Sequence, residues 1–187
     1  MGDHMAIVEV GNMLVQLLKE EMVPEVISGS HGIGLCSPAD KGDYALGIHL
    51  YDIRECEEIR TNGMQNTGPD RQQFPPMFIS LYYMMTAYSD SDLKFRAAEE
   101  QRILGRVMQI LYDHPTVPAR LLPGRSSGPE CRIELVDLDL EEKLRLWNTP
   151  DTPYKASLFY RVTPVEIQSM RTRKVARVTD ITFGIKE

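Results

Sequence analysis

Two residues that could carry out nucleophilic chemistry, His31 and Cys36, lie close together near the N-terminus. A cysteine attacks as the thiolate, which a neighbouring base or a positive field must stabilise. His31 lies in a glycine-rich turn, and the nearby sequence supplies no third group to orient its ring. We therefore interpret Cys36 as an inert filler. His49 alternates within a strand-like segment, which is typical of a satisfied sheet residue rather than of a ligand.

A second concentration of reactive groups is a run of carboxylates that could be placed around a hard cation: Glu134, Asp137, Asp139, Glu141 and Glu142. Calcium loops require oxygen donors at fixed offsets around a glycine turn, and no glycine lies in this run. We interpret these side chains as solvated strand and helix-cap charges. Residues 29–34 contain three glycines but lack the spacing of a nucleotide cradle. The sequence therefore predicts no catalytic residue, no cofactor and no metal site.

Composition limits the partners. The chain has 187 residues, enough for one α/β domain with a core of its own. Its 21 basic and 27 acidic residues give a net charge of -6, which argues against nucleic acid and against an anionic membrane as partners. The three cysteines form no CxxC pair, so we expect neither a disulfide framework nor a zinc ribbon. We expect the protein to be located in a reducing compartment.

The N-terminal residues 1–4 look like a cloning remnant ahead of a natural start at Met5, and we expect residues 5–187 to form a single domain. No secretion signal follows. The longest apolar run, residues 77–85, is far shorter than the roughly 18 to 20 residues of a spanning helix, so we expect a soluble protein.

Two consecutive segments must provide most of the core. Residues 75–89 alternate apolar side chains on both faces of an extended chain, so this strand should be covered on both sides. Residues 97–115 then place apolar side chains at spacings of three and four, which predicts an amphipathic helix lying against a sheet. The stripe consists of Ile103, Leu104, Val107, Met108, Ile110 and Leu111.

The sequence patterns that predict the remaining elements are less regular. We expect a helix over residues 5–22, short extended segments at 26–27 and 33–36, and a strand over 44–54 beside 75–89. A strand over 131–138 should lead into a helix over 140–147 capped by Asp139. Residues 154–162 and 174–185 are read as extended. Because helices do not separate the strands regularly, the fold class is α/β of the α+β kind, with a mixed or mainly antiparallel sheet and helices packed on it.

Function is expected on the segments outside this scaffold. Residues 61–74 are read as a long exposed loop and a contact candidate, and residues 115–129 as a connector or flexible arm. Arg171, Arg173, Lys174 and Arg177 form a basic run, either a solvated edge strand or a contact with an acidic neighbouring subunit. Trp147 is either a core anchor or an interface anchor.

With these segments placed, the chain resembles the tail-terminator, or cap, proteins of extracellular contractile injection systems, the phage-tail-like machines of the virulence-cassette and antifeeding-prophage type. The resemblance extends over nearly everything after Met5 and depends on the order and spacing of several motifs. These are IVEVGNMLVQLL at 7–18, IHLYDIRECEEIRTN at 48–62, PPMFISLYYMMTAYS at 75–89, EEQRILGRVMQILYDHP at 99–115 and LEEKLRLWNTPDTPYKASLFYRVTPVEI at 140–167.

The resemblance implies a structural bacterial protein and no enzyme: a homohexameric ring around the end of the inner tube away from the baseplate, which stops growth of tube and sheath. The implied partners are further copies of the chain, the inner tube protein and the sheath protein. Assembly would take place in the cytoplasm, and the finished particle can be released from the cell. We expect no C-terminal extension of the kind that some relatives have, so contacts from such a tail are not implied. The predicted interface residues are Arg60, Asn62, Arg71, Arg125, Trp147, Arg171, Arg173 and Lys174.

Two alternatives stay open at this point. The chain could be an adaptor at the neck or the baseplate of the same machine, which the sequence pattern does not separate from the cap. It could also be a small hydrolase that uses Cys36 or a carboxylate pair.

Overall fold

The computed structural model describes residues 4–59, 63–117, 130–147 and 153–175. Its centre is a five-stranded sheet in the order β1-β2-β5-β7-β6. The strands are β1 Ile33–Leu35, β2 Leu46–Glu55, β5 Met77–Ala87, β6 Arg132–Leu135 and β7 Ser157–Ile167. β1 runs parallel to β2 and the other neighbours are antiparallel, so the sheet is mixed, as expected.

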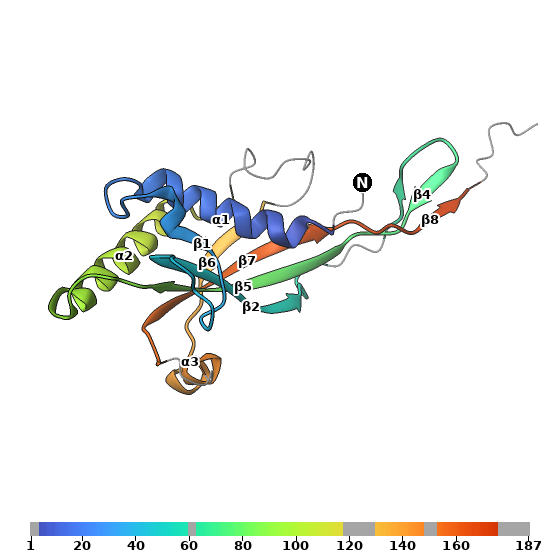
Figure 1. Cartoon of the computed structure of the whole chain (residues 1–187). Coiled ribbons are helices and arrows are strands. Elements are labelled where there is room, and N and C mark those ends of the chain that lie inside the picture. The colour runs from blue at the N-terminus through green and yellow to red at the C-terminus, as the bar shows by residue number, and fades with distance from the viewer. Residues whose placement is uncertain (1–3, 60–62, 118–129, 148–152, 176–187) are drawn as a thin grey trace, which may run out of the picture.

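Two long helices cover one face of the sheet and a short helix lies on the opposite face (Figure 1). The long helices are α1 Ala6–Met22 and α2 Leu93–Asp113, and the short one is α3 Leu140–Leu146. α1 contributes Leu14, Leu17 and Leu18 to the main core, each at most 1% exposed. Burial of one such side chain contributes about 1.5–3 kcal/mol to the free energy of unfolding. The amphipathic α2 confirms the predicted stripe, although Met108 is 43% exposed.

Strand β5 is covered on both faces, as its alternation predicts. Leu81, Tyr83 and Met85 belong to the main core under α1 and α2. Met84 packs with Phe159 and Trp147 in a smaller cluster on the other face, next to α3. β5 is also paired along both edges, with β2 and β7, and each ladder carries a register shift. Close to the shift against β7, the buried hydroxyls of Ser80 and Thr163 lie 2.8 Å apart and satisfy each other.

A second, three-stranded sheet is formed by β3 Gln65–Asn66, β4 Arg71–Gln73 and β8 Thr172–Lys174. The expectation of a featureless exposed loop over 61–74 is therefore wrong for the described part of that segment. Its backbone groups find partners more than ninety positions away: Phe74 N donates to Arg171 O at 3.0 Å and Val175 N to Asp70 O at 2.9 Å.

Other boundaries differ as well. Residues 26–27 are in a turn rather than extended, because the N–H groups of Val26 and Ile27 both donate to Met22 O at the end of α1. β7 begins later than expected and continues through Pro164 to Ile167. β6 is shorter than the expected 131–138. The predicted extended segment 174–185 and the connector 115–129 lie largely outside the described residues.

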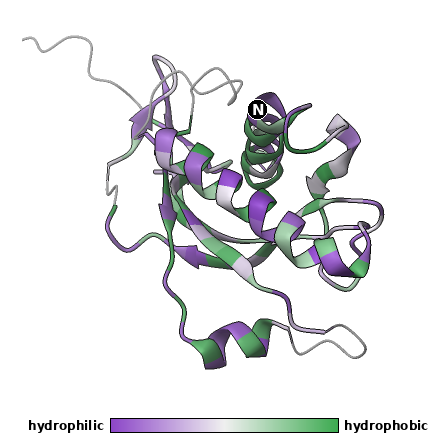
Figure 2. Ribbon diagram, turned by 90° about the vertical axis from the view of Figure 1, so that its left-hand side faces the viewer, coloured by the Kyte–Doolittle hydropathy of each residue, from purple (hydrophilic) through white to green (hydrophobic). Residues whose placement is uncertain are grey.

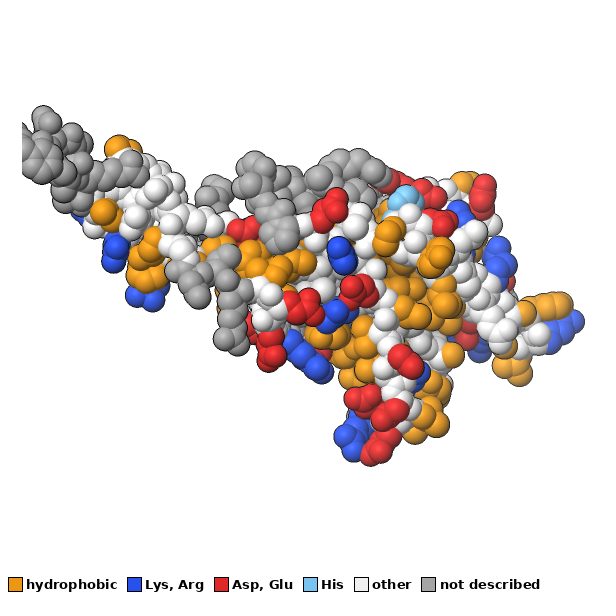
Figure 3. All heavy atoms as spheres, turned by 180° about the vertical axis from the view of Figure 1, so that it is seen from behind, with side chains coloured by type: hydrophobic (Ala, Val, Ile, Leu, Met, Phe, Trp, Pro, Cys, Tyr) orange, Lys and Arg blue, Asp and Glu red, His pale blue; other side chains and the backbone are white. Residues whose placement is uncertain are grey.

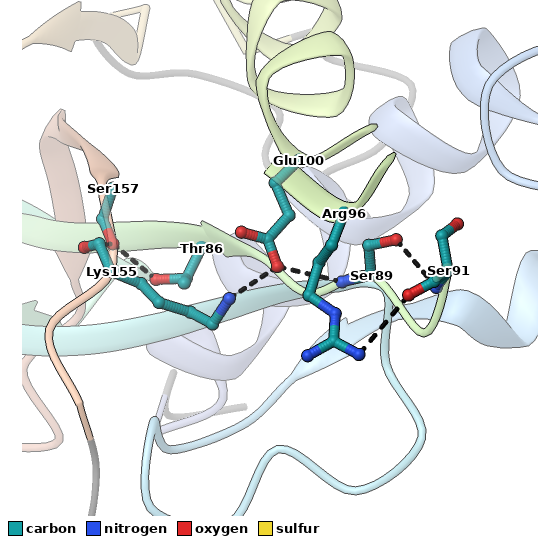
Figure 4. Close-up of polar contacts among 7 residues, drawn as sticks. All are labelled: Thr86, Ser89, Ser91, Arg96, Glu100, Lys155 and Ser157. Carbon is teal, nitrogen blue, oxygen red and sulfur yellow. Dashed lines mark hydrogen bonds and ion pairs between the residues drawn. The ribbon is translucent and has the colours of Figure 1, made fainter. Parts of the chain in front are cut away.

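A polar cluster fixes the beginning of α2 to the sheet (Figure 4). Glu100 lies in the first half of α2, and its Oε1 accepts hydrogen bonds from Ser89 N, just after β5, at 3.2 Å and from Lys155 Nζ, just before β7, at 2.5 Å. The two side chains of the ion pair are only 19% and 27% exposed. One carboxylate thus joins a helix to the ends of two strands.

Replacing Glu100 by Gln should lower the free energy of unfolding by about 1–3 kcal/mol, because a partly buried charged hydrogen bond to Lys155 is lost. Urea unfolding of Glu100→Gln, Lys155→Met and the double variant measures the coupling between them. Glu99→Gln is the matched control, since Glu99 pairs with Arg102 at the surface and should matter far less. Equal losses for Glu99→Gln and Glu100→Gln would contradict this assignment.

Candidate functional site

The most distinctive surface is a protrusion that we call the arm, defined as residues 63–76 and 168–175. It contains the three-stranded sheet and extends beyond the ends of β5 and β7, away from the helices (Figure 1). Pairing in this sheet brings together four predicted interface residues that lie in two distant parts of the sequence, Arg71, Arg171, Arg173 and Lys174. Arg60, Asn62, Arg125 and Arg177 lie outside the described residues.

The arm is basic and the rest of the chain is acidic. It contains the four basic side chains just named and one acidic residue, Asp70, so its formal charge is +3. Because the whole chain carries -6, the remainder carries -9. Within the described ranges, none of the four basic side chains forms an ion pair with a carboxylate. Arg171 instead lies over the ring of Phe74, 4.1 Å from its centroid, and Arg173 donates to Gln72 Oε1 at 3.4 Å.

Like charges face each other within the arm. Arg71 is the register partner of Lys174 across the β4–β8 ladder. Directly opposite like charges destabilise an antiparallel pair. Every residue of β3 and β8 is exposed, and in β4 Arg71 is exposed while Gln72 and Gln73 are partly buried. A small sheet without a buried face has little stability of its own, so the arm is suited to be completed by contact with another surface.

The second notable surface is α3, on the opposite face of the main sheet from α1 and α2. Its N-terminus has the predicted cap at Asp139, which is part of a capping box: Asp139 Oδ1 accepts from Glu142 N at 2.8 Å, and Glu142 Oε2 accepts from Asp139 N at 3.1 Å. Leu146 and Trp147 turn toward the sheet and contact the small cluster. Leu140 and Leu144, one turn apart, remain 64% and 48% exposed. Figure 2 shows the resulting mixture of hydrophobic and hydrophilic residues along α3.

Trp147 is 5% exposed and packs with Met84 and Phe159. Among the described residues, its buried Nε1 finds no hydrogen-bond partner. This position fits the alternative of a core anchor, which holds α3 on the sheet; its assignment to an interface stays a prediction.

A groove of about 590 Å³ runs between α3 and the sheet. Ion pairs engage several of its charged groups: Arg161 Nη2 lies 2.6 Å from Glu134 Oε2, and Arg54 Nε lies 2.6 Å from Asp52 Oδ2. Tyr51 and Tyr82 line the same groove, with ring centroids 6.1 Å apart. The sequence analysis did not single out this groove, although alternate positions on β2, β5 and β7 supply its aromatic and charged walls.

The candidate nucleophile is not activated. Burial raises the pKa of the half-buried Cys36 thiol, and burial also lowers the pKa of His49 on the neighbouring strand. Both directions favour the neutral thiol and the neutral imidazole over an ion pair. The ring of His31 lies against Gly29, within its own turn.

The carboxylate run is not a cluster of metal ligands either. In the part of the chain that the structure describes, no group of three or more His, Cys, Asp or Glu side chains is arranged to hold a metal ion. Among the same residues, no helix is both long enough and apolar enough to cross a bilayer.

Comparison with known proteins adds a family and two solved structures. The model of the Pvc16 N-terminal domain family matches residues 9–180. The sheath/tube terminator of PVC, an extracellular contractile injection system, solved in the extended state, is 17% identical with a TM-score of 0.68. The tube-terminating cap of the anti-feeding prophage is also 17% identical, with a TM-score of 0.66. No curated protein matches the sequence.

The two alignments cover 97% and 95% of this chain but only 63% and 61% of the respective solved chains. The chain therefore spans less than two thirds of the length of either protein. At 17% identity the likeness concerns the fold, and it includes the arrangement of sheet and helices expected from the sequence.

We expect Cys36 to react slowly with iodoacetamide at pH 7–8, because a raised pKa leaves less thiolate than in an ordinary thiol. The rate should rise as the pH passes the raised pKa. The alkylation rate is measured by treating the folded protein and then quantifying the modified Cys36 peptide by mass spectrometry, with glutathione as the reference thiol. His31→Ala should leave the alkylation rate unchanged. Fast alkylation of Cys36 at pH 7 that becomes slower in His31→Ala would instead support a Cys/His nucleophile pair.

Proposed function

The chain belongs to the Pvc16 N-terminal domain family, and from that premise we propose that it is a terminator subunit of a contractile, phage-tail-like injection system. In this role it ends assembly of the inner tube and the sheath. The observation that carries the proposal is the shared fold: a sheath/tube terminator and a tube-terminating cap both align over almost all of this chain.

The distribution of residues supports a structural role. The apolar side chains of α1, α2 and β5 are buried in the scaffold. The charged side chains of the arm, and those of α3 other than Lys143, are exposed. An assembly protein requires a rigid body that presents contact surfaces, and this chain has that organisation.

We propose that the subunits form a homohexameric ring at the tube end away from the baseplate. A heterologous contact produces a closed ring when the rotation between subunits closes, and a six-fold ring matches a six-fold tube. Each contact can then be weak, because the ring engages its partners through many repeated interfaces at once. The proposed partners are neighbouring copies, the inner tube protein and the sheath protein.

The predicted residues are divided among these contacts. Arg71, Arg171, Arg173 and Lys174 lie on the arm, where an acidic surface can reach them. Arg60, Asn62 and Arg125 remain predicted interface residues. The assembled particle is proposed to be built in the cytoplasm and to act outside the cell.

A strain that lacks the gene for this chain should make tubes of uncontrolled length, or sheaths that do not persist in the extended state. Negative-stain electron microscopy of purified particles gives the length distribution and the fraction with extended sheaths. Complementation with the wild-type chain should restore a narrow distribution. Uniform, stable particles in the deletion strain would rule out the terminator role.

A further inference from the structure

We propose that the arm of one subunit docks on the exposed side of α3 in the next copy, so that adjacent subunits join through a basic surface on one and an acidic surface on the other. The inference deepens the proposed function, and it depends on that function in requiring that copies of the chain lie side by side.

The arm supplies the basic half of the contact. Arg71 and Lys174 face each other across the β4–β8 ladder, and no carboxylate within the described ranges pairs with either. An external carboxylate placed between them would relieve this repulsion. Met170, at the base of β8, is 84% exposed and adds an apolar contact beside the charges.

The segment from β6 through α3 supplies complementary chemistry. Residues 134–146 contain five acidic and two basic residues, a net charge of -3 that matches the +3 of the arm. Within the subunit Glu134 pairs with Arg161 and Glu141 with Arg145, whereas Asp137 forms no ion pair among the described residues. Asp137 and Glu141 are exposed, and Leu140 and Leu144 lie uncovered beside them. Figure 3 shows acidic side chains gathered on the α3 protrusion and basic ones on the distant arm. Acidic and apolar groups together fit a surface that carries basic groups and an exposed methionine.

The contact must join different copies. α3 packs against Phe159, near the beginning of β7, whereas the arm follows the end of the same strand. β7 has 11 residues, and a strand advances about 3.3 Å per residue, so the two surfaces are roughly 30 Å apart on one subunit. β7 is hydrogen-bonded to β5 along its length, which prevents the arm from folding back. Figure 1 shows the arm leading away from α3.

Such a contact is heterologous, because the arm of each subunit meets a different surface on its neighbour. Heterologous contacts build rings when the rotation closes. Exposed ion pairs are individually weak and are screened by salt, so the ring should loosen at high ionic strength unless the tube end holds it. One arm per subunit would repeat the contact around the whole ring.

Charge reversal on assembled particles tests the partner. Chains carrying Arg173→Glu with Lys174→Glu, chains carrying Asp137→Lys with Glu141→Lys, and chains carrying all four changes are each expressed in the deletion strain. Each two-site reversal should lower the amount of this chain on purified particles at least about tenfold, because the loss repeats at every contact. The four-site variant should recover most of it. Thermal unfolding should change little for all three variants, since the altered side chains lie outside the core and Glu141→Lys removes only an exposed ion pair with Arg145.

Oxidative cross-linking identifies the contact directly. Lys174→Cys combined with Asp137→Cys should give dimers and higher multimers of this chain on non-reducing gels of particles, and neither single variant should do so. The proposal would be overturned if Lys174→Cys cross-linked to tube or sheath protein, or if the two cysteines together gave no multimers. It would also be overturned if the charge reversals had no effect, or if the four-site variant did not recover. If the charge reversals and the cross-linking give these negative results but the deletion strain still loses length control, only the arm–α3 contact is rejected and the terminator role stands. If the deletion strain makes uniform particles, the terminator role itself is rejected.

Discussion

Strand β5 is paired along both edges and covered on both faces, and the positions of the other elements follow from this constraint. Its backbone groups are used by β2 and β7, while Leu81 and Met85 face α1 and α2 and Met84 faces the α3 side. A strand buried in this way cannot slip by one residue without moving its apolar side chains to the wrong face. The register of the whole central sheet is therefore strongly specified. The ends of β5 and β7, held in that register, also carry the arm.

Burial of the scaffold leaves charge as the main means of recognition at the periphery. The body of the chain is acidic, and a positive charge concentrated on a protrusion makes one end of the subunit electrostatically different from the rest. An asymmetric charge distribution favours head-to-tail association over symmetric pairing, because two like surfaces repel. Such polarity suits the head-to-tail ring that we propose.

The sequence predicts elements whose burial produces a regular pattern. The helices around Leu17 and Val107 and the strand around Tyr83 follow from periodicity, and the Asp139 cap follows from local chemistry. The arm could not be predicted in this way, since its short strands are polar and pair with residues about a hundred positions away, as Gln72 does with Arg173. β7 also continues through Pro164, past the predicted end at residue 162. Pro164 lies beyond Thr163, the last residue paired with β6, and beside the register shift against β5, where a missing N–H is tolerated. Consequently the basic residues of the candidate site were identifiable one by one, whereas their assembly on one protrusion was not.

The most direct measurement is a cryo-electron microscopy reconstruction of both ends of intact particles that carry an affinity tag on this chain. We expect a closed ring of this chain on the last tube layer, at the end away from the baseplate, with each arm against α3 of the neighbouring subunit. Density for the chain at the baseplate, or at a position where tube and sheath continue past it, would contradict the central claim.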